Sequence, residues 1–480
     1  MTKYSLALIP LLMASTAIAG PATEEGAAHL TEVFQTYLGS TEGVVSVEID
    51  GEDYAVTLDG SILMAGLAMN GAEFTTSPIE MTLTDNGDGT WGVSQDQAFS
   101  IITKDGMGGE GKQDIAKLTM EGVFDESLMI MTSSTGTLEG LKQVQTQTMP
   151  DGSTLTSEMI VEMTTASSTA VAGASGGADG EVKYDSTGIS MTMSMPQGEG
   201  MPAMPIAIKA ASANYAGKLT GLRSEGILGI LAFFVAHPDE AAIKGAKDEA
   251  KAAITAALPL WNNILVDGKV SGVTAETPVG PVALDEVTFT VDLNGAVTEG
   301  KFREAFSVSG LTLPPGLVPD WAAPILPQKV SIDFQATGFD AAAGVTALLG
   351  AFDLPEDGMA DTTAFDAAVE KGFLPNGTVQ VSINPSAITG DGYELTYQGD
   401  MTVDIASEMP SGKALVTLTG ADKLQAAING APEDMKMQAM MGFGMAQGMA
   451  KQEGDKLIWE IDATNPMNPL INGVSMMGGQ

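Results

Sequence analysis

The sequence contains no cysteine, only two histidines (His29 and His237) and few aromatic residues, which make up 5% of the chain. Without cysteine the chain can form no disulfide, so its stability must come from burial of apolar surface. Two histidines and no thiol leave nucleophilic catalysis without its ordinary base. The 61 acidic residues single out no carboxylate pair. We therefore predict no catalytic site and no cofactor, and keep a carboxylate-dependent hydrolase as the second alternative function.

Basic residues are also scarce: 22 Lys and Arg stand against 61 Asp and Glu, for a net charge of −39. Nucleic acids and anionic membranes are bound mainly through Lys and Arg, so we expect neither as a partner. A binder of cations would fit this charge, but a solvated acidic surface that keeps the protein soluble is the favoured interpretation.

No hydrophobic run is long enough to span a bilayer, which takes about 20 apolar residues. Residues 1–19 place Lys3 before an apolar run that ends in Ala17-Ile18-Ala19, as in a secretory signal peptide. We predict cleavage after Ala19 and a periplasmic location, with no transmembrane segment in the mature chain. A retained membrane anchor is the disfavoured alternative.

Alternating apolar and polar residues dominate what is present. Examples are ISMTMSM (189–195), VTFTVDL (287–293), KVSIDFQA (329–336) and LIWEI (457–461), and turn dipeptides such as Asn294-Gly295 fall between runs of this kind. Period-two patterns separated by such turns are typical of antiparallel strands and hairpins. The sequence therefore predicts a mainly β (α+β) protein with large antiparallel sheets.

Helical periodicity interrupts this pattern at residues 23–38 and, as two helices with a break at His237-Pro238, at residues 224–261. The second segment divides the chain into two β-rich parts. Residues 164–180 are small, polar and rich in glycine, which predicts a flexible loop. The predicted organisation is a signal peptide (1–19), an N-terminal β-rich domain (20–223), a helical hairpin (224–261) and a C-terminal β-rich domain (262–480) with helices near 341–372 and 421–450.

Three short motifs resemble functional sites, but their sequence contexts argue against such sites. Residues 106–112 fit glycine-rich phosphate loops, yet Gln113 stands where a Mg²⁺ ligand is needed and Glu110 would repel phosphate, so we predict a hairpin connection. Ser175 lies in a G-x-S-x-G motif without the strand and helix that a nucleophile elbow needs. Residues 85–90 lack the oxygen ligands of a calcium loop and predict a tight turn.

Methionine is unusually frequent, with 29 residues. Met437, Met441, Met445 and Met449 recur every four residues and would form a stripe on one helix. Thioethers are soft ligands that select Cu(I), which makes a periplasmic copper carrier the first alternative function. We favour packing of this stripe on a sheet, because methionine fills irregular cores. A third interpretation is an adaptable apolar face for partners or lipid chains.

The stretches LTLPPGLVPDWAAPILPQKVSIDFQATGFD (311–340), AAAGVTALLGAFD (341–353) and LIWEIDATNPMNPLINGVSM (457–476) resemble an exported, uncharacterised family of alphaproteobacteria, domain of unknown function 2125. The resemblance runs over most of the predicted mature chain. It implies an exported, β-rich protein and brings no catalytic or ligand residues with it.

These observations predict a non-enzymatic periplasmic protein that binds an apolar small molecule, a lipid or another envelope protein. Apolar strand faces covered by the helices at 224–261 and 421–450 are the predicted place for a ligand. The candidate ligand-binding residues are Phe233, Phe234, Trp261 and Trp321, for which a purely structural role in the core is the alternative.

Overall fold

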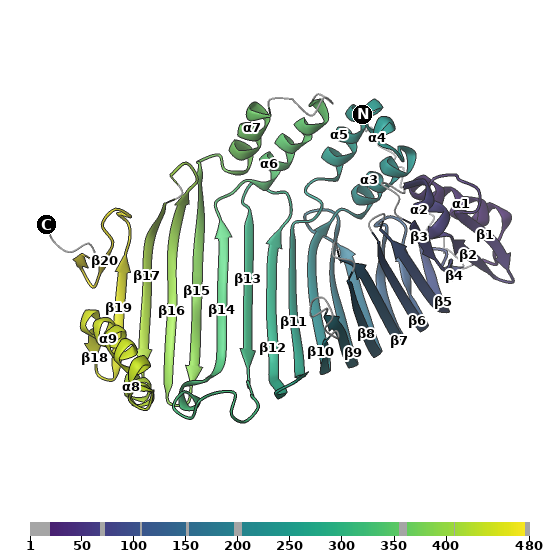
Figure 1. Ribbon diagram of the computed structural model, residues 1–480. Helices are drawn as coiled ribbons and strands as arrows, with labels where there is room; N and C mark the ends of the chain where they lie inside the picture. The colour runs from purple at the N-terminus through teal and green to yellow at the C-terminus, as the bar shows by residue number, and fades with distance from the viewer. Residues whose placement is uncertain are drawn as a thin grey trace, which may run out of the picture.

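The computed structural model describes residues 20–67, 73–105, 108–149, 153–195, 204–354, 362–407 and 409–475. The predicted signal peptide at 1–19 lies outside this part of the chain. The protein is mainly β, with 54% strand and 24% helix. Its strands form one long antiparallel sheet with helices at its ends and along one rim (Figure 1). The predicted fold class is confirmed.

The sheet follows the chain, because each strand from β4 to β17 pairs with its neighbour in sequence. The first strands are β1 (Val45–Asp50), β2 (Asp53–Leu58), β3 (Glu73–Thr76), β4 (Ile79–Asp85), β5 (Thr90–Lys104), β6 (Gly109–Asp125), β7 (Ile130–Thr148), β8 (Thr154–Ala172), β9 (Ala178–Met195) and β10 (Met204–Leu222). The later strands are β11 (Asn263–Thr277), β12 (Gly280–Asn294), β13 (Lys301–Ser309), β14 (Pro327–Thr337), β15 (Thr378–Gly390), β16 (Tyr393–Asp404), β17 (Pro410–Thr419), β18 (Lys451–Glu453), β19 (Lys456–Asp462), β20 (Leu470–Ile471) and β21 (Val474–Ser475).

The helices lie before β1, between β2 and β3, between β10 and β11, between β13 and β14, between β14 and β15, and between β17 and β18. They are α1 (Glu24–Leu38), α2 (Gly60–Leu67), α3 (Ser224–Ala236), α4 (Glu240–Gly245), α5 (Lys247–Ala257), η1 (Ala323–Ile325), α6 (Ala341–Leu348), η2 (Leu349–Asp353), α7 (Thr363–Phe373), α8 (Ala421–Asn429) and α9 (Glu433–Met449). Helices α3 to α7 follow one rim of the sheet, whereas α8 and α9 lie at its C-terminal end (Figure 1).

The N-terminal end of the sheet is closed by helix α1. Thr23 caps this helix, because its hydroxyl accepts a hydrogen bond from the backbone N–H of Gly26. The apolar face of α1 packs on the first strands and forms a buried cluster with them. That cluster comprises Ala27, Leu30, Tyr54, Val56, Leu83, Trp91 and Val93.

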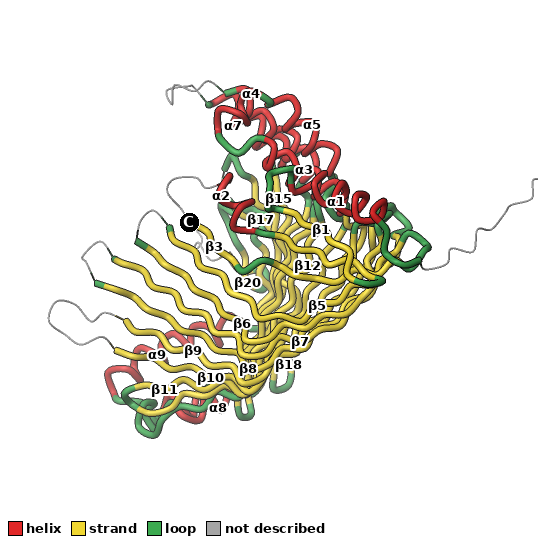
Figure 2. Tube along the Cα trace, turned by 90° about the vertical axis from the view of Figure 1, so that its right-hand side faces the viewer, coloured by secondary structure: helices red, strands yellow, loops and turns green. Residues whose placement is uncertain are grey.

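The long strands β5 to β12 are bent near their middles, so the sheet has a V-shaped cross-section with two arms (Figure 2). We call the line of the bend the crease. On alternate strands it contains Gly140, Gly188 and Gly272, whose φ angles are 64°, 63° and 62°, and it ends at Gly310 (φ 71°) just after β13. Glycine adopts positive φ at little cost, and one such residue turns an extended strand. The pairing register places Ala116 opposite Gly140 on the preceding strand β6, and Glu162, Ala211 and Asp285 on the strands between the glycines.

Three sequence predictions are corrected by this fold. Residues 164–172 and 178–180 belong to β8 and β9, so the predicted loop at 164–180 shrinks to the turn 173–177. The predicted hairpin at 224–261 contains three helices rather than two. The two β-rich parts are not separate sheets, because β10 pairs with β11 along most of its length. The helices predicted near 341–372 and 421–450 are present.

Candidate apolar groove

The V has an inner face and an outer face, which burial distinguishes at the crease. Ile115 and Val161 on one arm and Ala213 on the other are buried beside it. The crease residues Glu162 and Asp285, in contrast, are exposed. A side chain inside an angle is enclosed by both arms, so the first set marks the inner face. Helix α1 covers the N-terminal end of this same face.

One arm carries helices α3 to α7 at its rim, and we call it the helix-bearing arm. Its inner face begins with an apolar row next to the crease. In a sheet, directly paired residues point to the same face, so the register defines the row from strand to strand. Two of its side chains are hydroxyls, Thr164 on β8 and Ser186 on β9. The full row is Leu118, Leu138, Thr164, Ser186, Ala213, Val270, Val287, Val308, Val330, Ile388, Leu395, Leu418 and Leu457.

A second inner row on this arm is aromatic. Tyr215 and Phe289 lie with their ring centroids 5.9 Å apart, and the ring of Phe289 covers the intervening Gly268. The row also contains small residues, which leave its floor open between the larger ones. In order it is Met120, Gly136, Ala166, Tyr184, Tyr215, Gly268, Phe289, Phe306 and Ile332.

The second arm continues the apolar surface on the far side of the crease. Its nearest row is Phe99, Ile115, Leu141, Val161, Ile189 and Ala210. Met191 and Ile208 pair one step further out, whereas Gln113 and Gln143 make this face more polar toward β6 and β7. The two arms therefore enclose an apolar groove, defined here by the inner rows of both arms, that runs across the strands.

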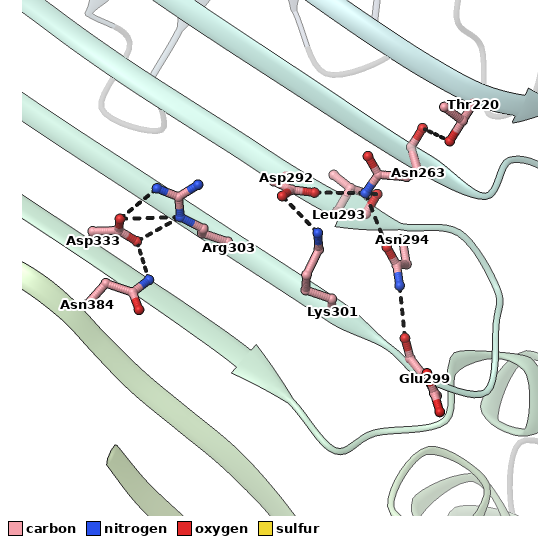
Figure 3. Close-up of polar contacts among 10 residues, drawn as sticks. All are labelled: Thr220, Asn263, Asp292, Leu293, Asn294, Glu299, Lys301, Arg303, Asp333 and Asn384. Carbon is pink, nitrogen blue, oxygen red and sulfur yellow. Dashed lines mark hydrogen bonds and ion pairs between the residues drawn. The ribbon is translucent and has the colours of Figure 1, made fainter. Parts of the chain in front are cut away.

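The outer face carries the charge. Interstrand ion pairs join Lys142 to Glu158 at 2.8 Å and Lys218 to Glu181 at 3.0 Å, and both pairs stand on residues that alternate with the inner rows. Further along the same face, Lys301 pairs with Asp292 at 2.8 Å and Arg303 with Asp333 at 2.7 Å (Figure 3). The placement of these ion pairs outside and of the apolar rows inside follows from the period-two pattern of the strands.

The polar cluster in Figure 3 contains two half-buried carboxylates, Asp292 and Asp333, and the pKa of each is lowered. The bidentate guanidinium of Arg303 lowers the pKa of Asp333, although burial opposes the shift, and the amide of Asn384 assists it. At Asp292 burial acts to raise the pKa. Hydrogen bonds from Asn263 and Lys301 outweigh this effect, so the pKa of Asp292 lies below its usual value. A general acid at neutral pH needs a raised pKa, so neither carboxylate suits that role.

Much of the inner face is left uncovered by the helices. Tyr184, Phe306 and Ile332 are 45%, 43% and 42% exposed, although they lie in the middle of the groove. An apolar sheet face is ordinarily buried against a second layer. Of the helices that the structure describes, α1 covers the N-terminal end, and α8 and α9 lie at the C-terminal end (Figure 1). The groove between these ends can accept an apolar ligand.

Helix α2 stands between the arms near the N-terminal end of the groove (Figure 2). A hollow of about 670 Å³ lies there, with Met64 of α2, Phe74 of β3 and Leu155 of β8 in its lining. Polar residues of the second arm, Gln145 and Ser157, complete it. The groove is therefore mixed in polarity at this end and apolar along the crease.

The four predicted ligand residues are not brought together. Phe233 is buried in α3 and stacks on His237, with ring centroids 4.4 Å apart, which is a core role. Phe234 follows it and is 38% exposed. Trp261 lies just before β11, and Trp321 contacts Gly430 at the opposite, C-terminal end. The structure thus gathers a different set, the inner rows, than the one expected from the sequence.

The methionine stripe lies at the surface. Met437, Met441, Met445 and Met449 of α9 are all exposed, so the favoured prediction that this stripe packs on a sheet is wrong. Met191 and Met193 of β9 are half-buried in the inner rows, as expected for the period-two pattern.

The three weak motifs lie at or beside the connections between neighbouring strands. Of residues 106–112, Gly108 lies in the hairpin connection between β5 and β6 and residues 109–112 begin β6, with Gly106 and Met107 outside the described residues. Ser175 lies in the turn between β8 and β9, where its backbone carbonyl accepts a hydrogen bond from Arg223. Residues 86–89 form the turn between β4 and β5. The hairpin predicted at 106–112 and the tight turn predicted at 85–90 agree with the described residues, whereas Ser175, predicted to lie in a longer loop, is in a short turn.

Sequence reasoning missed the crease and the aromatic row. Gly140, Gly188 and Gly272 each stand inside a strand pattern, which is the signal of a bulge or bend, but their alignment across the sheet needs the pairing register. The same register is needed to place Tyr184, Tyr215 and Phe289 in one row, since they come from three strands.

Among the described residues, no helix is long and apolar enough to cross a membrane. Comparison of the chain with protein-family models, with curated proteins and with solved structures finds no match.

Proposed function

We propose that the protein binds the acyl chain of a lipid in the apolar groove. The observation that supports this proposal is the inner face itself. Its rows consist mostly of Leu, Val, Ile, Phe and Tyr side chains, several of which stay exposed between α1 at one end and α8 and α9 at the other. Each methylene that leaves water for such a surface contributes about 0.8 kcal/mol.

The dimensions of the crease suit a hydrocarbon chain. Neighbouring strands are about 4.8 Å apart, so the seven strands from β6 to β12 give a crease roughly 29 Å long. An acyl chain of one bilayer leaflet spans about half of a hydrocarbon core of ~30 Å. The groove is long enough for one such chain, lying across the strands along the crease.

The ligand is an apolar chain rather than an ion or a polar metabolite, because the ion pairs between strands that the described residues form in this region face outward. A chain without hydrogen-bonding groups leaves no donor or acceptor unpaired when it is buried. Thr164 and Ser186 are the polar interruptions of the row beside the crease, and they bond to each other at 2.9 Å.

The test is lipid extraction and mass spectrometry of the full chain purified without detergent, followed by titration with a fluorescent fatty acid. Ala166→Trp fills the inner row, whereas Thr165→Trp adds the same ring to the outer face of the same strand. We expect co-purified lipid, and at least a tenfold loss of probe affinity for Ala166→Trp alone. Absence of both lipid and probe binding, or equal affinities of the two variants, would contradict the proposal.

We further propose, from the sequence pattern at 1–19, that the protein is exported and that this function is carried out in the periplasm. The test is fractionation of cells followed by mass measurement of the N-terminal peptide. A mature chain that starts at Gly20 is the expected result, and a full-length chain in the cytosol would contradict it. Membership of the family named above stays a prediction.

The hydrolase alternative finds little support in the outer-face carboxylates, since Asp292 and Asp333 have lowered pKa values. An envelope protein as the partner remains the other form of the binding prediction. It would appear in the same purification as a co-purifying chain instead of a lipid.

A further inference from the structure

Helix α9 presents an exposed surface made of methionine. Met437, Met441 and Met445 are 73%, 64% and 60% exposed, and Met435, Met440 and Met449 are exposed as well. Lys436, Ala439, Phe443 and Ala446 form the less exposed side of the same helix.

The orientation of α9 is fixed by contacts on its other side. The indole N–H of Trp459 in β19 donates to the carbonyl of Ala446 at 2.8 Å. The side-chain amide of Asn472 donates to the carbonyl of Met449 at 2.7 Å. These bonds attach the helix to the sheet and leave the methionine side facing solvent.

The repeated choice of methionine needs a reason specific to sulfur. Leucine has a similar helix propensity and replaces methionine with little cost in packing, yet each exposed large apolar residue of α9 is methionine. Met437, Met440 and Met441 stand at positions i, i+3 and i+4, which are neighbours on a helix surface. Their flexible side chains can bring three thioether sulfurs to one point.

We propose that Met437, Met440 and Met441 bind one Cu(I) ion. Soft thioethers select Cu(I) over hard cations, which prefer oxygen ligands. In the part of the chain that the structure describes, no cluster of His, Asp and Glu offers a competing metal site. His29 is hydrogen-bonded to Glu126 and His237 to the carbonyl of Phe233. The net charge of −39 adds a general attraction for cations.

This site lies apart from the crease. Helix α9 lies at the C-terminal end of the sheet (Figure 1), whereas the crease runs from Ala116 on β6 to Gly310 just after β13. Loss of Cu(I) binding is therefore expected to leave fatty-acid binding unchanged, and the Ala166→Trp variant is expected to keep its Cu(I) site.

The test is an anaerobic titration of the full chain with Cu(I) in competition with a chromophoric Cu(I) chelator. We expect one equivalent to bind, and Met437→Leu/Met440→Leu/Met441→Leu to lose at least tenfold in affinity. The matched control is Met445→Leu/Met449→Leu, which removes two exposed thioethers of the same helix and should keep the wild-type affinity.

Circular dichroism of both variants checks that α9 stays folded. We expect it to do so, because leucine and methionine have similar helix propensities. Equal affinities of the triple variant and the wild type would overturn the proposal. So would the absence of Cu(I) binding in the wild-type chain, including the case in which α9 instead binds neutral lipid vesicles or another protein.

Discussion

Glycine residues with positive φ set the bend of the sheet. At Gly140 an added Cβ would lie 2.9 Å from the Cβ of Ala116 on the neighbouring strand, so both the backbone angle and the close approach require glycine. Gly377, in the turn before β15, has a similar φ of 66° but nothing within 4 Å of an added Cβ. At Gly377 only the positive φ angle requires glycine, whereas at Gly140 both the φ angle and the close approach of Ala116 require it.

We predict that Gly140→Ala lowers the free energy of unfolding more than Gly377→Ala. Both variants incur about 1–2 kcal/mol from a left-handed residue, but only Gly140→Ala also forces Ala116 to move. The measurement is urea unfolding of both variants, with the difference between them as the readout. Equal losses would mean that the crease has no steric requirement for glycine.

The ion pair between Arg303 and Asp333 is the second feature that acts through single residues. Their bidentate contact lowers the pKa of Asp333. A carboxyl group with a lowered pKa in the folded state stabilises that state above its unfolded pKa of about 3.9. This contribution is lost as the pH falls through the folded pKa.

We therefore predict that Asp333→Asn lowers stability by about 1 kcal/mol at pH 7, a value discounted for partial exposure. The difference from the wild type should shrink as the pH falls below 4. Thermal unfolding at pH 7, 5 and 3 measures it, and Asp391→Asn, in an exposed turn, is the control. A difference that persists unchanged at pH 3 would show that the ionised pair is not its cause.

At the scale of elements, strands β8 and β9 show how neighbours override local composition. Small residues and glycines between 164 and 180 favour a loop by themselves. In the sheet, Thr164 to Ala172 pair with β9 from Ser186 to Ala178, and Thr164 to Thr169 also pair with β7. Two ladders of backbone hydrogen bonds satisfy the polar groups of β8, so a low apolar content does not prevent strand formation.

We predict that the amides of residues 164–169 exchange hydrogen slowly, because β7 and β9 flank them on both sides. The turn 173–177 should exchange quickly and serves as the internal control. Hydrogen exchange followed by mass spectrometry of overlapping peptides measures both. Fast exchange throughout residues 164–180 would contradict this prediction and support the flexible loop that the sequence predicts.

At the scale of the whole molecule, one sheet joins the two β-rich parts. The ladder between β10 and β11 runs from Ala207–Glu276 to Thr220–Asn263. Separating the chain between these strands would leave two long, unpaired edges, and such edges promote aggregation. The helical segment at 224–261 is thus a connection over the rim and not a boundary between domains.

We predict that residues 20–223 and 262–480, expressed separately, aggregate or fail to fold, whereas the chain 20–480 is monodisperse. Size-exclusion chromatography and circular dichroism of the three proteins provide the measurement. Co-expression of the two fragments should restore soluble material, because β10 and β11 can then pair. Two independently folded, soluble fragments would show that the predicted domains are real.

The sequence by itself determined the β-rich class, the turns and the separation of charged from apolar residues on each strand, because these features depend on a period of two along a single segment. It also located α1, whose cap and apolar face are local. Only the tertiary structure decided that Gly140, Gly188 and Gly272 align in one crease and that Tyr184, Tyr215 and Phe289 share one row. It also decided that Met437 and Met441 face solvent. These outcomes depend on the register between strands and on how α9 is attached to β19, and such contacts join residues that are far apart in the chain.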